Sequence, residues 1–177
     1  MRRVSFSNSN VDVADLALHH ADVESALRDY FSSVAPSYTV RFAGYASYEI
    51  VEELETRLTE VDMTSSLTIL TAVEATFRID YLQRCYQRKK DALSRAFRDL
   101  HKRKGLNVRL EEEIFDLWKK HTNGANQLIG DLKGAFKYRH WLAHGRYWTP
   151  KLGKKYDFVS LYALATNVLS NFPLLRP

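Results

Sequence analysis

The sequence holds little of what commonly constrains or interrupts a fold. Cys85 is the only cysteine, so the 177-residue chain can form no internal disulfide and supplies no thiolate cluster for a metal. Only four prolines and seven glycines punctuate it. No apolar run approaches the roughly 20 residues that cross a bilayer, and the start MRRVSFSNSN leads into polar residues instead of an apolar signal region. We therefore expect a cytoplasmic protein with no membrane partner.

What the chain does have is a helical period. Hydrophobic residues make up 45% of it and charged residues 27%, which is ordinary for one globular domain. Long stretches repeat every 3.6 residues, so we predict a single all-α domain over residues 1–177, an antiparallel bundle of about five to seven helices. The expected helices are 11–34, 48–61, 64–89, 91–104, 110–121, 126–144 and 156–171, with SYTVRFAGY as a loop of partly extended character.

Positive charge is concentrated in one segment. The formal net charge is +5, but the segment from residue 84 to residue 104 alone carries +7, which leaves about −2 for the rest. A basic stripe suits a polyanion such as RNA, because neutralised phosphates release counterions. It is equally consistent with a solvated helix face. The basic residues of this segment are Arg84, Arg88, Lys89, Lys90, Arg95, Arg98, Lys102, Arg103 and Lys104.

Two charged residues fall on apolar helix faces. Glu74 lies inside the wedge of about 80° that holds the apolar residues of the 64–89 helix, and Arg139 lies near the middle of the apolar stripe of the 126–144 helix. Because an isolated buried ion costs several kcal/mol, we predict that the two face one another. The pair could fix the register of the bundle or belong to a functional site. Arg78, one turn after Glu74, could share the carboxylate or contact phosphate.

The stretch KYRHWLAHGRYW adds a histidine to this arginine. His144 precedes Gly145, a favoured C-cap residue, so it should lie in the last helical turn, where the macrodipole favours the imidazolium. A histidine that moves protons and an arginine that balances phosphate charge suit phosphodiester cleavage. Residues five apart on a helix point about 140° away from each other. Arg139 and His144 can therefore converge only if the helix unwinds at Gly145 or phosphate lies over the helix end.

Arg139 and His144, written R-HWLA-H, resemble the RxxxxH motif of the HEPN superfamily of small all-helical domains. The motif lies in a late helix, a further amphipathic helix follows it, and the earlier helix SLTILTAVEATFRIDYL carries Glu74 on its inner face. The resemblance covers about residues 48–172 and leaves the first 45 outside. One departure is His140, because the family commonly has asparagine after the arginine. Another is Tyr147, three residues after His144, where some members have a tyrosine two residues after.

The resemblance implies an endoribonuclease that uses neither a metal nor another cofactor. The ribose 2′-OH attacks the adjacent phosphate, with His144 in proton transfer and Arg139 stabilising the transition state. Glu74 would orient Arg139, while His140, Arg78 and Tyr147 support the site and Arg146 joins the RNA-binding residues. Family members are commonly homodimers, and many belong to toxin–antitoxin, phage-defence or stress systems. RNA, a second copy of the chain and a cognate antitoxin or regulatory protein are the partners to expect.

Two other interpretations fit the same residues. His140 and His144 have the i, i+4 spacing of two metal ligands on one helix face, and a metal-dependent hydrolase could take its third ligand from Glu74 or Asp131. Alternatively, a non-catalytic HEPN-like module would bind RNA or a protein. The nearby rings could stack on RNA bases, although we favour packing for Trp141. The rings are Tyr138, Trp141, Tyr147 and Trp148. The sequence shows no Gly-rich phosphate loop and no serine nucleophile elbow.

Overall fold

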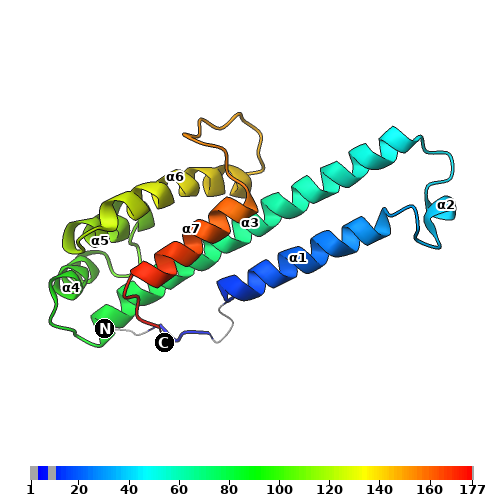
Figure 1. The fold of residues 1–177 in the computed structure, drawn as a ribbon. Coiled ribbons are helices and arrows are strands. Elements are labelled where there is room, and N and C mark those ends of the chain that lie inside the picture. Colours follow the sequence, from blue (N-terminus) through cyan, green and yellow to red (C-terminus); the bar gives the residue numbers. More distant parts are fainter. Residues whose placement is uncertain (1–3, 8–10, 177) are drawn as a thin grey trace.

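The computed structural model describes residues 4–7 and 11–176, and in these ranges the protein is all-α. Seven α-helices and one π-helical turn pack as a bundle with no strand among the described residues, as predicted (Figure 1). The elements are α1 (Val13–Tyr30), α2 (Tyr38–Arg41), α3 (Ser47–Tyr86), α4 (Ala92–Lys104), η1 (Leu110–Ile114), α5 (Phe115–His121), α6 (Ala125–Ala143) and α7 (Phe158–Asn171).

Helix α3 is the longest helix described, and α1, α4, η1, α6 and α7 all contact it. Its 40 residues correspond to about 60 Å at 1.5 Å per residue. The prediction of a helix break between residues 61 and 64 was wrong. The Asp62 carboxylate, which lies in the expected break, accepts a hydrogen bond at 2.9 Å from the backbone N–H of Phe158, the first residue of α7. Asp62 therefore caps a different helix while α3 runs through it.

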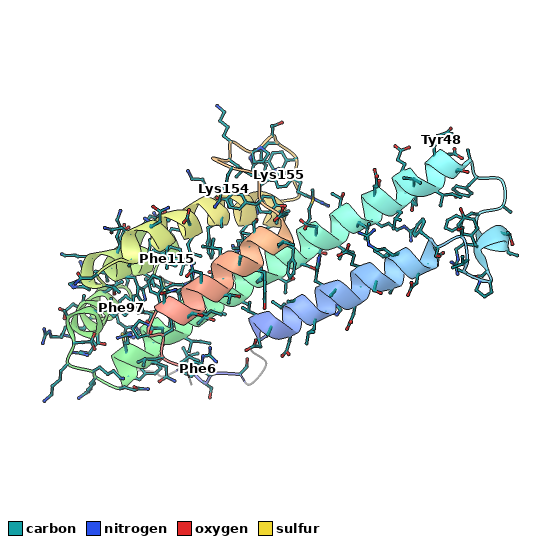
Figure 2. All side chains as sticks on the ribbon, in the orientation of Figure 1. Phe6, Tyr48, Phe97, Phe115, Lys154 and Lys155 are labelled. Atoms are coloured by element: carbon teal, nitrogen blue, oxygen red, sulfur yellow. The ribbon has the colours of Figure 1, made fainter. Side chains whose placement is uncertain are left out.

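The core occupies the end of the molecule where α3 meets α4, α5, α6 and α7 (Figure 1). Trp118, Phe77, Phe97 and Phe115 are among its largest fully buried side chains. The ring of Phe77 meets those of Phe115 and Trp118 edge-on, with centroids 4.9 and 6.1 Å apart. Figure 2 shows Phe97 and Phe115 inside this part of the molecule. Burial of large aromatic rings at a few helix contacts is what holds this region together.

The opposite end is an arm, residues 25–57, in which the end of α1 runs beside the start of α3 and α2 closes the tip (Figure 1). The tip holds an aromatic cluster in which Phe42 contacts Phe31 and Tyr38, with ring centroids 5.1 Å apart in both cases. The expectation of an extended loop was wrong here, because Tyr38 and Phe42 have the i, i+4 spacing that a helical turn brings together. Tyr48 lies at the tip (Figure 2).

In the part of the chain that the structure describes, no helix combines the length and the apolar character needed to cross a membrane.

Candidate functional site

Glu74 and Arg139 meet, as the sequence predicted. The Nη2 of Arg139, from α6, lies 3.0 Å from the Oε2 of Glu74 on α3. The second carboxylate oxygen, Oε1, accepts a hydrogen bond at 2.8 Å from the Nε of Arg78, one turn further along α3. Arg78 also donates to the backbone carbonyl of Val108 at 3.1 Å. One carboxylate therefore holds two guanidinium groups, and we call these three side chains the Glu74 cluster.

The Glu74 cluster lies at the edge of the core, within reach of solvent. The side chains of Glu74, Arg139 and Arg78 are 17%, 32% and 41% exposed. The Nε of Arg139 is buried, and no hydrogen-bond partner for it is found among the described residues. Arg139 is thus fixed in place through one end of its guanidinium while about a third of its side chain stays accessible.

The C-terminal end of α6 brings two histidines together. The helix ends at Ala143, and His144 is its C-cap, with φ −103° and ψ 23°, followed by Gly145 in the left-handed region at φ 80°. The helix therefore stops where the sequence predicted that it would. The ring of His144 meets that of His140 edge-on, with centroids 4.1 Å apart, and both residues are exposed. His140 is the residue after Arg139 in the chain, and its ring contacts that of His144.

The loop after α6 folds back over the other face of that helix. The indole Nε1 of Trp141 donates to the carbonyl of Trp148 at 2.6 Å, and the Trp141 ring stacks on Tyr138. The preference for packing at Trp141 is therefore confirmed. Arg146 forms an ion pair with Glu60 on α3 at 2.7 Å, and hydrogen bonding to Glu60 raises the pKa of Arg146. Tyr147 is 84% exposed.

A hollow of about 280 Å³ lies beside His140, where η1 meets the loop after α6. It includes Glu111, a residue that the sequence analysis missed. Burial, together with the neighbouring Glu112, raises the pKa of Glu111, while Arg139 and two nearby lysines lower it. Glu111 sits on a π-helical turn, a feature that often accompanies functional sites but has no simple sequence period. Arg139 and His144 are not among the described residues that line this hollow.

Over residues 4–7 and 11–176, no group of three or more His, Cys, Asp or Glu side chains is arranged to hold a metal ion. The rings of His140 and His144 lie together, but neither expected third ligand is free. Glu74 holds two guanidinium groups, and Asp131 pairs with Lys154 at 3.8 Å.

Most of the basic segment is exposed, with one correction. Arg84, which we placed among the RNA-binding residues, is buried in a salt bridge with Asp80 at 2.8 Å, so it is not available to phosphate. The burial follows from its position on the inner side of α3, facing the end of the chain. The exposed members are Arg88, Lys89, Lys90, Arg95, Lys102, Arg103 and Lys104, with Arg98 half-buried.

In comparisons with known proteins, no family model, no curated protein and no solved structure matched this chain.

Proposed function

We propose that this protein is a metal-independent endoribonuclease of the HEPN type. The observation that carries the proposal is the combination of an arginine fixed by a carboxylate from another helix and an exposed histidine at the end of the same helix. Arg139 is held at 3.0 Å by Glu74, yet about a third of its side chain is accessible. His144 stands exposed five residues later in the R-HWLA-H motif.

In the proposed reaction, the ribose 2′-oxygen attacks the adjacent phosphorus and the bond from phosphorus to the 5′-oxygen breaks. The products carry a 2′,3′-cyclic phosphate and a 5′-hydroxyl. His144 transfers the protons, and Arg139 balances the charge that develops on the phosphate oxygens. Glu74 keeps the guanidinium in one orientation, which lowers the cost of aligning it with the substrate. Arg78 shares this carboxylate, and the ring of His140 contacts that of His144.

A homodimer would complete the site. The two motif side chains sit on different sides of α6, and within one chain neither lines the hollow beside His140. If two copies place their motifs in one cleft, Arg139 of one chain and His144 of the other can act on the same phosphate. The family resemblance implies such a dimer, and the exposed position of His144 is compatible with it.

The decisive experiment is cleavage of a labelled RNA in the presence of a chelator. We expect the wild-type protein to cut and to leave cyclic phosphate ends, and His144→Ala and Arg139→Ala to lose about 100-fold or more in rate. His19→Ala, an exposed histidine on α1, is the matched control and should cut normally. Cleavage that requires added metal, or that survives in both variants, would overturn the proposal.

Mixing the two inactive variants tests the shared cleft. If each site draws on both chains, a mixed dimer of Arg139→Ala and His144→Ala keeps one intact pair, and activity should partly return. Activity that does not return in a demonstrably mixed dimer argues that each chain works alone.

The basic segment is the proposed contact surface for the RNA backbone. Each lost phosphate contact should reduce the slope of log affinity against log salt by about 0.7 for a single strand. We expect the triple variant Lys89→Ala, Lys90→Ala, Arg95→Ala to show a shallower slope than the wild type in a filter-binding assay. Lys119→Ala, an exposed lysine on α5, is the control. An unchanged slope would place the RNA elsewhere.

A non-catalytic module that binds RNA or a protein is the second candidate. Both oxygens of Glu74 are occupied by arginines, an arrangement that could serve helix packing alone. Retention of RNA without cleavage under any condition would favour this alternative.

A further inference from the structure

A separate hollow of about 770 Å³ lies where the end of α3 meets α4, away from the Glu74 cluster. Pockets that hold small organic ligands typically measure about 300–1,000 Å³. The described residues around it combine basic and apolar side chains, among them Cys85, Arg88, Arg98, His101, Lys102 and Leu106. Two properties of this hollow, an apolar floor and a basic rim, identify the kind of molecule that fits it.

The floor is apolar and chemically quiet. Cys85 is 5% exposed, and burial raises the pKa of its thiol to about 12, so it stays neutral at physiological pH and repels no anion. Leu106, in the turn after α4, is 58% exposed beside it. An exposed leucine next to a hollow offers apolar surface that a ligand can cover.

Basic groups at the rim are held in place by the fold. Arg98 donates through Nη1 to the backbone carbonyl of Lys89 at 2.6 Å, so this guanidinium is anchored at one end. The hydroxyl of Tyr81 donates to the carbonyl of Gly105 at 2.9 Å and lies 2.9 Å from the Nδ1 of His101. Because that hydroxyl has one proton and the carbonyl can only accept, Nδ1 is the donor to Tyr81. In the neutral ring the Nε2 of His101 is then an acceptor, so it pairs with an anionic oxygen only after the ring takes up a second proton.

Arg88 occupies a backbone position that favours glycine. It follows Gln87, the C-cap of α3, and its φ of 51° lies in the left-handed region. Glycine is the usual residue at this position after a helix, because a side chain there is strained. Strained backbone positions of this kind cluster at ligand-binding sites. The side chain of Arg88 lines the hollow.

We propose that this hollow binds a single-chain amphiphilic anion, with an aliphatic chain on Cys85 and Leu106 and a carboxylate or phosphate headgroup held by Arg88 and Arg98. Cationic side chains at the rim match an anionic headgroup. A bare inorganic anion has no apolar part, so it would leave the apolar floor uncovered. The described lining includes no phenylalanine, tyrosine or tryptophan on which a nucleobase could stack. The occupant is therefore an aliphatic amphiphile.

Calorimetric titration of the intact protein tests the proposal with four probes, each kept below its micelle concentration. Dodecanoate and dodecyl phosphate should bind with one site per chain and at least tenfold more tightly than inorganic phosphate. Dodecyltrimethylammonium should not bind measurably. A preference between the two anions identifies the headgroup. Equal affinity for inorganic phosphate would overturn the proposal in favour of a plain anion site, and equal affinity for the cation would show unspecific apolar adsorption.

Three variants test whether the ligand binds at this hollow. One of them, Arg88→Gly, should weaken binding without lowering the stability of the fold. Arg88→Gly should weaken dodecyl phosphate at least tenfold while the thermal midpoint stays the same or rises, because glycine relieves the backbone. Arg98→Met and Leu106→Asp should weaken it similarly. Lys119→Ala, which removes one positive charge from α5, should bind like the wild type. Unchanged binding in all three variants would overturn the proposal.

The result does not depend on ribonuclease activity. The same titration with the His144→Ala protein should give the wild-type affinity, so failure of the amphiphile site and failure of the proposed catalysis are distinguishable.

Discussion

Helix α3 carries two carboxylate–arginine clusters of the same local design and opposite burial. Glu74 with Arg78 and Asp80 with Arg84 are both i, i+4 pairs, and together they lie within about three helical turns. The side chains of Asp80 and Arg84 are 0% and 7% exposed, whereas those of Glu74 and Arg78 are 17% and 41% exposed. Identical spacing thus produces a sealed ion pair in one place and an open one in the other.

The chain end is what seals the Asp80 cluster. Asp80 accepts from the Nε of Arg84 and from the backbone N–H of Leu175, both at 2.8 Å, and Arg84 donates to the carbonyl of Pro173 at 2.7 Å. Burial raises the pKa of Asp80 even though these partners lower it. A buried pair with its hydrogen bonds made has a structural role. The Glu74 cluster keeps part of Arg139 accessible. Arg139 can therefore contact a substrate, whereas the buried Arg84 cannot.

The largest effect should come from breaking the sealed pair. Asp80→Ala leaves the buried Arg84 guanidinium with only the exposed Asp91, 3.4 Å away, as a carboxylate partner, and we expect the free energy of unfolding to fall by about 3–5 kcal/mol. Chemical denaturation measures it. Asp99→Ala, an exposed aspartate on α4, is the control and should change stability by less than about 0.5 kcal/mol. A loss at Asp80 no larger than the control would mean that burial does not distinguish the clusters.

The open cluster should cost less when it is broken. For Glu74→Ala we expect a loss of about 1–2 kcal/mol, because its arginines can turn to solvent. A double-mutant cycle of Glu74 and Arg139 should give a coupling energy smaller than the cycle of Asp80 and Arg84. On the proposed function, Glu74→Ala also lowers the rate of RNA cleavage under conditions in which the variant is still fully folded. Equal coupling in the two cycles would remove the distinction.

A third measurement extends the comparison to Cys85, next to Arg84 at the sealed end of α3. Its pKa is about 12 in the folded protein against 9.0 for an ordinary thiol, so the unfolded chain loses this proton first. The contribution of the protonated thiol to the free energy of unfolding is fully present below pH 9. It is lost as pH rises towards 12, at up to about 1.4 kcal/mol per pH unit. Denaturation series of the wild type and Cys85→Ala should diverge in slope over this range. Parallel curves would contradict the burial of the thiol.

The smallest effect belongs to the exposed pair of Glu60 and Arg146, whose side chains are 53% and 36% exposed. Glu60→Ala should lower stability by about 0.2–1 kcal/mol, and the difference should shrink in high salt. A loss comparable to that of Asp80→Ala would show that exposure is a poor guide to these clusters.

The helical period was enough to predict the fold class and one contact of the site. Glu74 stood out because it interrupts an apolar stripe, and its pairing with Arg139 followed from the cost of burying either ion alone. The same reasoning overlooked Asp80, because a carboxylate four residues before an arginine is usually a surface pair. Only the contact with Leu175, 95 residues away in the chain, turns that pair inward, and no local pattern encodes it.

Other differences arise from distant contacts or from a change in helix geometry. Helix α3 runs through Asp62, and the N–H group that this carboxylate satisfies belongs to Phe158 on α7, 96 residues away in the chain. Glu111 lies on a π-helical turn, where the 3.6-residue count that located Glu74 does not apply. Whether His144 and Arg139 act on RNA stays a prediction.

The uninterrupted course of α3 has a mechanical consequence. The aromatic tip near Tyr48 (Figure 2) and the hollow beside Cys85 stand at opposite ends of one helix about 60 Å long, too far apart for a single small ligand to touch both. Because α3 has no break between these two points, we expect a displacement at the tip to tilt or rotate the whole helix. We therefore expect a partner that binds the arm to act on Glu74 and Cys85 together, because both residues belong to this same helix.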